Sequence, residues 1–170
     1  MKYSGIDLHS NNCFVVVTDE ADRVLESKRV KNELAQILAL LAAHRSELQA
    51  VVVESTYNWY WLVDGLQDAG YTVHLANTGA IKQYDGLKHG DDASDARHLA
   101  QLLRLGLLPC GTILPRADRA LRDLARKRMQ LVRSRTQHIL ALQNIYARQF
   151  GHGLASNQIK RMRAEDMDRL

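Results

Sequence analysis

Residues 117–150 contain neither glycine nor proline, which limits how this chain can fold more than any other feature. Apolar side chains recur along the segment at helical spacing, at Leu121, Leu124, Leu131, Ile139, Leu142 and Ile145. Because an α-helix rises about 1.5 Å per residue, the pattern predicts one helix of about 50 Å. A lone helix of that length cannot bury its apolar stripe, so we expect an arm that pairs with another helix, in a hairpin or between subunits. Arg128 and Arg135 fall near the seam and argue against a clean two-stranded zipper.

Charge changes at the same place in the chain. Residues 1–115 carry 10 basic and 14 acidic side chains, whereas residues 116–135 carry 8 basic and 2 acidic ones. A basic segment after an acidic globular part is typical of contact with a polyanion such as nucleic acid, and a solvated helix face is the alternative. The candidate nucleic-acid-binding residues are Lys88, Arg119, Arg122, Arg126, Lys127, Arg128, Arg133 and Arg135.

Composition excludes several classes of protein. The 170 residues are 46% hydrophobic and 25% charged, which is typical of a folded globular chain. No apolar run reaches the roughly 20 residues that a membrane span requires, and the N-terminus does not resemble a signal peptide. Cys13 and Cys110 lack the spacing of a zinc site or disulfide framework. We therefore expect a cytoplasmic protein without a membrane partner.

The first 105 residues alternate strand-like and helix-like patterns in the order β-β-β-α-β-α-β-α-α. A meander followed by βαβ units predicts a mixed, five-stranded sheet with flanking helices, the order of a ribonuclease H-like α/β fold. Asn32 is the predicted N-cap of the first helix. We predict a sheet domain over residues 1–112, a long helical arm over 113–151 and a polar, mobile tail over 152–170.

Four carboxylates fall where this fold would bring them together. Asp7 lies within the first strand, where burial of a carboxylate costs several kcal/mol unless it is compensated. Glu54 ends the strand over residues 48–54, the predicted parallel neighbour of the first. Asp92 and Asp95 share one face at the start of a helix. Asp91 directly precedes them, and we interpret it as the N-cap.

These carboxylates predict a metal site. Oxygen donors without a nearby cysteine or histidine ligand favour Mg²⁺ or Mn²⁺, and a two-metal carboxylate site suits phosphodiester chemistry. Each residue also has a simpler interpretation. Asp7 is also typical of a turn at a strand end, Glu54 of a helix cap, and Asp95 of a first-turn helix acid.

Aromatic and histidine residues near these acids allow two interpretations each. Trp59, Tyr60 and Trp61 are suited to stacking on bases, but their helical spacing favours the core. His9 and His89 lie near the acids, where each could transfer protons or simply form hydrogen bonds.

Four stretches together resemble a known family. They are GIDLHSNNCFVVVTDE, VVVESTYNWYWLVDGLQDAGYTVHLAN, LKHGDDASDARHLAQLLRLGLLP and RALRDLARKRMQLVRSRTQHILALQN, and the resemblance extends from Met1 to about Gly151. They are similar to the Piv/MooV-type DEDD insertion-sequence transposases, recombinases guided by a bridge RNA. The string D-x-x-D-A-R-x-L-A, with the upstream G-I-D and V-V-V-E-S-T, carries most of the specificity.

The resemblance implies a RuvC-like domain in which Asp7, Glu54, Asp92 and Asp95 are the catalytic and metal-binding DEDD residues. It implies Mg²⁺ (or Mn²⁺) as cofactor, and insertion-sequence DNA ends, target DNA and a structured guide RNA as partners. It also implies a coiled-coil arm, dimers that pair into tetramers, and association with the nucleoid during action. Family members continue into a domain with a catalytic serine. No serine of this chain matches that motif, so we expect no nucleophilic serine here and no complete strand exchange by this piece alone.

Two other functions compete with recombination. The chain could be an RNA-binding and dimerisation module without chemistry of its own. A more remote alternative is an actin-like phosphotransferase, because GIDLHS also resembles the first phosphate loop of that fold. No later glycine-rich phosphate motif supports it.

Overall fold

The computed structural model describes residues 1–81, 91–163 and 165. The chain divides into two compact units, Met1–Ile113 and Leu114–Leu170, called here the sheet unit and the arm unit. Among the described residues, no helix is both long enough and apolar enough to cross a membrane.

The sheet unit contains a mixed sheet of six strands in the order β3-β2-β1-β4-β5-β6. The strands are β1 (Lys2–Leu8), β2 (Asn12–Asp19), β3 (Val24–Lys31), β4 (Leu48–Glu54), β5 (Val73–Ala76) and β6 (Cys110–Gly111). β1, β4 and β5 are parallel to one another, while β2, β3 and β6 pair antiparallel with their neighbours. The mixed α/β sheet is confirmed. The sixth strand adds only two residues to the five predicted, too few to leave an alternating pattern in the sequence.

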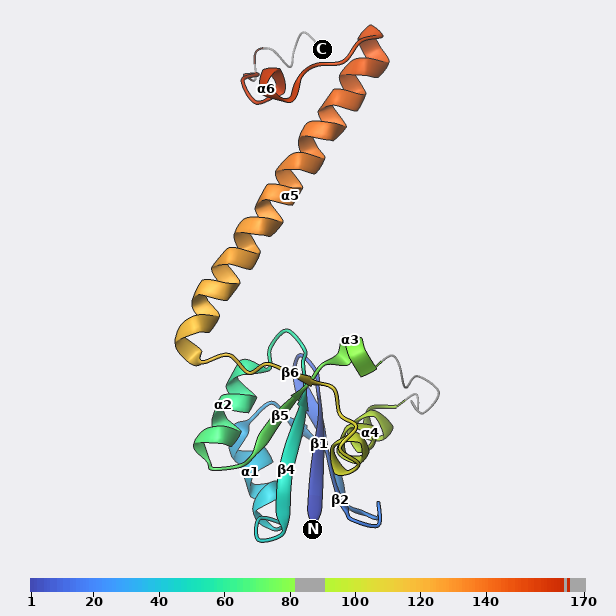
Figure 1. Cartoon of the computed structure of the whole chain (residues 1–170), viewed down its shortest axis with the longest axis vertical. Coiled ribbons are helices and arrows are strands. Elements are labelled where there is room, and N and C mark those ends of the chain that lie inside the picture. Colours follow the sequence, from blue (N-terminus) through green and yellow to red (C-terminus); the bar gives the residue numbers. More distant parts are fainter. Residues whose placement is uncertain (82–90, 164, 166–170) are drawn as a thin grey trace. The chain divides into compact units, whose positions relative to one another are not determined.

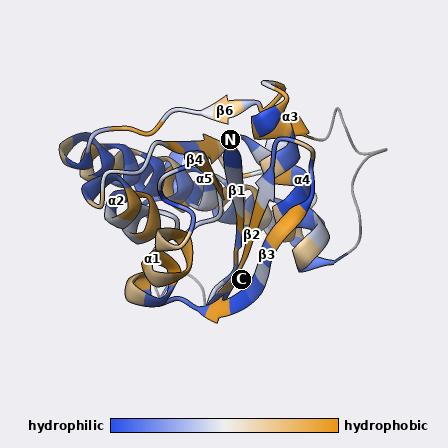
Figure 2. Cartoon of the chain, turned by 90° about the horizontal axis from the view of Figure 1, so that it is seen from below, coloured by the Kyte–Doolittle hydropathy of each residue, from blue (hydrophilic) through white to orange (hydrophobic). Residues whose placement is uncertain are grey.

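Helices cover both faces of the sheet (Figures 1 and 2). α1 (Leu34–Ala42) and α2 (Tyr60–Asp68) lie on one face and α4 (Asp92–Arg104) on the other, while α3 (Thr78–Ile81) follows β5. The larger core lies beneath α1 and α2 and includes Ile6, Leu8 and Leu62. Trp59 is buried in the same core, with Tyr60 and Trp61 packed against it, so the core interpretation of the aromatic residues is confirmed.

Asn32 differs from its predicted role. The first helix has Glu33 at its N-cap position, without a side-chain cap. The Asn32 amide instead donates to the backbone carbonyls of His9 and Ser10, both at 3.0 Å. These acceptors come from the loop between β1 and β2, so only the tertiary fold brings them within reach of Asn32.

The arm unit is built on α5 (Arg116–Phe150), the single long helix that the sequence predicts. α5 ends at Gly151, whose φ of +74° belongs to the left-handed conformation that glycine adopts easily. The short helix α6 (Ser156–Ile159) follows, and its Ile159 is buried. The Gln143 side-chain amide donates to the Leu154 carbonyl at 2.7 Å, so part of the predicted tail is held against α5.

Candidate metal centre

The start of α4 is fixed by its own sequence. Asp91 is the N-cap, and its carboxylate accepts a 2.6 Å hydrogen bond from the Ser94 backbone N–H. The predicted capping role of Asp91 is therefore confirmed. Asp92 and Asp95 occupy the first turn, where the partial positive charge of the helix N-terminus favours carboxylates.

Gly5 determines how closely α4 approaches β1. A Cβ atom added at Gly5 would lie 1.9 Å from the Ala96 carbonyl oxygen and 2.8 Å from the Ala100 nitrogen. Only glycine therefore permits this contact between two backbones. Asp7 lies two residues beyond Gly5 on β1, and Asp92 lies four residues before Ala96 on α4. Both separations span about 6–7 Å. The contact of Gly5 with Ala96 thus brings Asp92 to Asp7.

Three side chains from two segments converge at this point. His9 Nε2 lies 3.2 Å from Asp7 Oδ2 and 3.3 Å from Asp92 Oδ1. One ligand atom from each of the three residues falls within 4.8 Å of the others. The second oxygen of Asp92 is bound by the Arg29 guanidinium, which extends from β3.

The burial of these atoms fits a bound cation. The Asp7 side chain is only 4% exposed. Asp7 Oδ2 and His9 Nε2 are both buried, and neither has a hydrogen-bond partner among the described residues. A buried carboxylate oxygen without a directed hydrogen bond is costly, and a divalent cation between two carboxylates would offset that cost.

The thiol of Cys13 lies in the same buried, negatively charged surroundings as Asp7. Burial, and secondly the negative charge of Asp7, raise the pKa of Cys13 to about 12. Cys13 lies on β2, one residue along from Phe14, the register partner of Asp7. The thiol therefore stays protonated and is unsuited to the role of a nucleophile at neutral pH.

The other two predicted ligands, Glu54 and Asp95, lie nearby but outside this cluster. Glu54 directly follows Val53, the register partner of Ile6, and so continues β4 beside Asp7. Asp95 is half-buried in the first turn of α4. The three-residue cluster contains neither of them, so their ligand role stays a prediction.

His9 is the residue that sequence reasoning did not assign to the metal. The sequence indicates His9 as a residue near the acids but not as a ligand, and its Nε2 lies 3.2 Å from Asp7 Oδ2 and 3.3 Å from Asp92 Oδ1. The usable signal was its separation of two residues from Asp7, because side chains two apart in an extended segment point to the same side. Lys88 and His89 lie outside the described residues.

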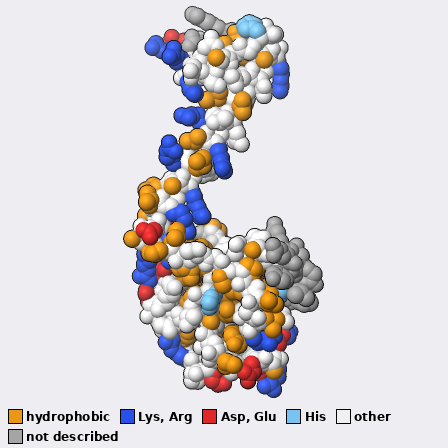
Figure 3. Space-filling view, in the orientation of Figure 1, with side chains coloured by type: hydrophobic (Ala, Val, Ile, Leu, Met, Phe, Trp, Pro, Cys, Tyr) orange, Lys and Arg blue, Asp and Glu red, His pale blue; other side chains and the backbone are white. Residues whose placement is uncertain are grey.

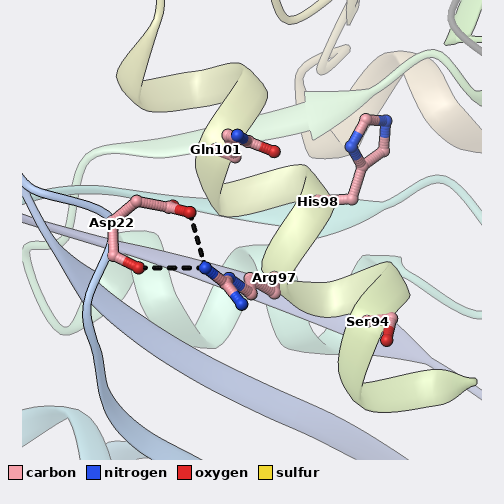
Figure 4. Close-up of a pocket in the computed structure, with 5 residues that line it drawn as sticks. All are labelled: Asp22, Ser94, Arg97, His98 and Gln101. Carbon is pink, nitrogen blue, oxygen red and sulfur yellow. Dashed lines mark hydrogen bonds and ion pairs between the residues drawn. The ribbon is translucent and has the colours of Figure 1, made fainter. Parts of the chain in front are cut away.

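A separate polar pocket of about 320 Å³ lies beside α4 (Figure 4) and is lined by Asp22, Ser94, Arg97, His98 and Gln101. Arg97 Nη2 donates to Asp22 Oδ2 at 2.7 Å and to the Asp22 carbonyl at 3.2 Å. Asp22 is at the turn between β2 and β3 and has a φ of +62°. The pocket therefore lies at the ion pair and hydrogen bond that hold this turn against α4.

The basic candidates on α5 differ in exposure. Arg126, Lys127, Arg128, Arg133 and Arg135 are exposed, and Figure 3 shows Lys and Arg side chains interspersed with hydrophobic ones along this helix. The other two are less accessible: Arg122 is half-buried and Arg119 is buried.

Arg122 lies 3.3 Å from Asp123, and the Arg119 Nε donates to the Leu114 carbonyl at 2.9 Å. The exposed five are therefore the accessible charges of the predicted interface.

Comparison with solved structures supports the fold. RuvC of T. thermophilus in complex with a Holliday junction substrate matches with a TM-score of 0.50 and 18% identity, covering 65% of this chain and 99% of that one. A second Thermus thermophilus RuvC structure matches with a TM-score of 0.45 and 18% identity, covering 65% of this chain and all (100%) of that one. The first match, whose TM-score is 0.50, shows that the sheet unit has a RuvC-like fold.

No curated protein matches the sequence. A family model does match, over residues 4–150, which include most of the sheet unit and all of α5. That model is the DEDD transposase family of the IS110 type. The chain therefore belongs to the IS110-type DEDD transposases.

Proposed function

We propose that this chain supplies the metal-dependent carboxylate centre of a DNA recombinase that acts on insertion-sequence ends and target DNA. The observation that carries the proposal is the convergence of Asp7 and Asp92 from separate elements, with a buried Asp7 oxygen that lacks a hydrogen-bond partner among the described residues. Membership of the transposase family supports phosphodiester bonds as the proposed substrate class.

Mg²⁺ (or Mn²⁺) is the proposed cofactor. Asp7 and Asp92 would hold it, with Glu54 and Asp95 as the flanking ligands that the family resemblance implies. When bound, such ions stabilise charge on the attacking and leaving oxygens of an in-line displacement. The chain's own contribution is positional: Asp7 is rigid because it is buried in a central strand, and Asp92 is held by the first turn of α4.

The arm unit is the proposed contact for nucleic acid and for a second copy of the chain. Its exposed arginine and lysine side chains suit the phosphate backbones of a structured guide RNA and DNA. Its exposed Leu121 and Leu124 suit a dimer, and dimers that pair into tetramers follow from the family resemblance. This function would be carried out in the cytoplasm, on nucleoid DNA.

Titration calorimetry with Mg²⁺ and Mn²⁺ tests the metal centre directly. We expect the variants Asp7→Asn and Asp92→Asn to bind at least about tenfold more weakly than wild type, because each removes a charged ligand. Asp68→Asn, at an exposed position on α2, is the matched control and should bind as wild type does. A wild-type chain that binds neither ion would overturn the proposal.

Binding of a structured RNA in Mg²⁺ separates this proposal from the pure binding module. RNA affinity should fall with rising salt, because phosphate contacts release counterions. If the double variant Asp7→Asn, Asp92→Asn binds RNA as wild type does, and wild type binds no metal, the module without chemistry is the better description.

A further inference from the structure

We propose that His9 is a direct nitrogen ligand of the metal, and that it makes this centre prefer Mn²⁺ over Mg²⁺. The inference rests on the proposed metal centre, and it changes the expected ligands from oxygen alone to oxygen plus one imidazole. His9 lies in the loop directly after β1. It is not one of the four carboxylate residues that the sequence predicts as ligands.

The distances match those of neighbouring ligands on one ion. Two atoms that each lie about 2.1–2.3 Å from a cation are about 3.0–3.4 Å apart when they are adjacent ligands. His9 Nε2 lies 3.2 Å from Asp7 Oδ2 and 3.3 Å from Asp92 Oδ1. The nitrogen therefore already stands at the separation from both oxygens that shared coordination requires.

The orientation of the ring supports the same role. The His9 side chain is 40% exposed, yet its Nε2 atom is buried and directed toward the carboxylates. Neither contact qualifies as a hydrogen bond, although each is short enough in distance. A lone pair on Nε2 aimed at a cation accounts for both observations.

The backbone of His9 is held from both sides. Its N–H donates to the Asn12 carbonyl at 2.9 Å. Its carbonyl accepts from the side-chain amides of Asn32 at 3.0 Å and Asn58 at 3.1 Å. The Asn58 amide oxygen in turn accepts from the Thr56 hydroxyl at 2.8 Å. Such support fixes a ligand before the metal arrives, which is how protein metal sites hold their geometry.

The chemistry of the donors sets the preference between ions. Mg²⁺ binds oxygen ligands almost exclusively, whereas imidazole favours transition metals. Mn²⁺ accepts carboxylates as Mg²⁺ does, and it gains more from a nitrogen ligand. One histidine among carboxylates therefore shifts selectivity toward Mn²⁺ without excluding Mg²⁺.

Pulsed electron paramagnetic resonance of bound Mn²⁺ tests the inference, because a directly coordinated imidazole gives a ¹⁴N modulation. We expect this modulation in the wild-type chain and in His138→Gln, which replaces an exposed histidine on α5. It should be absent from His9→Gln. Calorimetric titrations should show that the ratio of Mn²⁺ to Mg²⁺ affinity falls about tenfold in His9→Gln and stays constant in His138→Gln.

The outcomes separate the two proposals. Bound Mn²⁺ without ¹⁴N modulation in wild type, or with modulation that persists in His9→Gln, overturns the role of His9 and leaves the carboxylate centre intact. An unchanged affinity ratio in His9→Gln overturns the metal preference. Absence of any Mn²⁺ or Mg²⁺ binding overturns the proposed function as well. The wild-type spectrum alone can refute the ligand role, so the test does not depend on the stability of the variant.

Discussion

Both units of the chain contain regularly spaced apolar side chains, but these are buried in the sheet unit and exposed on α5. In the sheet unit, Ile6 and Leu62 are completely buried, at 0% exposure. On α5, Leu121 and Leu131 are 72% and 59% exposed. The apolar faces of α1 and α2 pack against the sheet. The apolar stripe of α5, a helix of 35 residues, has no such surface among the described residues. An apolar helical period therefore predicts a buried face only where the same chain supplies the surface that buries it.

Truncation of one leucine in each unit gives the largest contrast. Leu62→Ala should lower the free energy of unfolding by about 2–5 kcal/mol, because it leaves a cavity in the core. Leu131→Ala should change it by less than about 0.5 kcal/mol in dilute solution, because its side chain stays in water. Urea denaturation at low protein concentration measures both. Equal losses would show that α5 is buried by its own chain and would break the comparison.

Gly5→Ala tests how tightly the sheet unit is packed at its backbone contacts. The new Cβ would collide with the Ala96 carbonyl, so we expect a loss of about 1–3 kcal/mol and weaker metal binding as Asp92 moves away from Asp7. Gly79→Ala is the control, since its nearest neighbour would be the Asn77 side-chain oxygen at 3.5 Å. Thermal unfolding and calorimetry of the two variants provide the measurement. A neutral Gly5→Ala would mean that α4 shifts freely.

Leu131→Asp sharpens the comparison on the side of the arm. We expect the variant to fold as wild type does but to have a lower mass by light scattering, because a charge in the apolar stripe opposes pairing of two arms. Thr136→Asp, at an exposed position about 140° around the helix from Leu131, is the charge-matched comparison. An unchanged mass for Leu131→Asp, measured across protein concentrations, would show that the arm does not mediate assembly.

Asp19→Asn should give the smallest effect, and one that depends on pH. The Arg23 backbone N–H, and further hydrogen bonds from the Arg23 guanidinium and the Ala21 N–H, hold the pKa of Asp19 below its ordinary value of 3.8. A lowered pKa in the folded state contributes stability above the ordinary pKa, and this contribution disappears as the pH falls through the folded-state pKa. The melting temperature of Asp19→Asn should therefore lie slightly below that of wild type at pH 7. The difference should vanish in strong acid, and a difference that grew with acidity would contradict this assignment.

Much of the fold follows from local patterns. The strands of the sheet unit and the length of α5 follow from residue periodicity, and the Asp91 cap follows from hydrogen-bond chemistry within one turn. β6 does not, because its two residues pair with β5 only after the chain has folded back. Neither does the altered role of Asn32, whose acceptors come from another loop.

Only the part of the site that depends on strand order and on the start of a helix was predictable from the sequence. Strand order and helix start bring Asp7 and Asp92 together, and both can be placed from the sequence. The side-chain directions of Glu54 at a strand end and Asp95 on a helix depend on packing that the sequence does not state. His9 entered the cluster through a loop whose path is held by asparagine side chains from two other segments.

The contact of Arg29 with Asp92 has a consequence for the charge balance of the sheet unit. Arg29 is 57% exposed on β3, and its guanidinium also lies over the Phe14 ring, 5.9 Å from the centroid. Its guanidinium supplies from within the chain the positive charge that a carboxylate needs beside Asp7. We therefore expect the sheet unit to fold without an ion, because Arg29 holds Asp92 Oδ2 and leaves Asp92 Oδ1 facing His9.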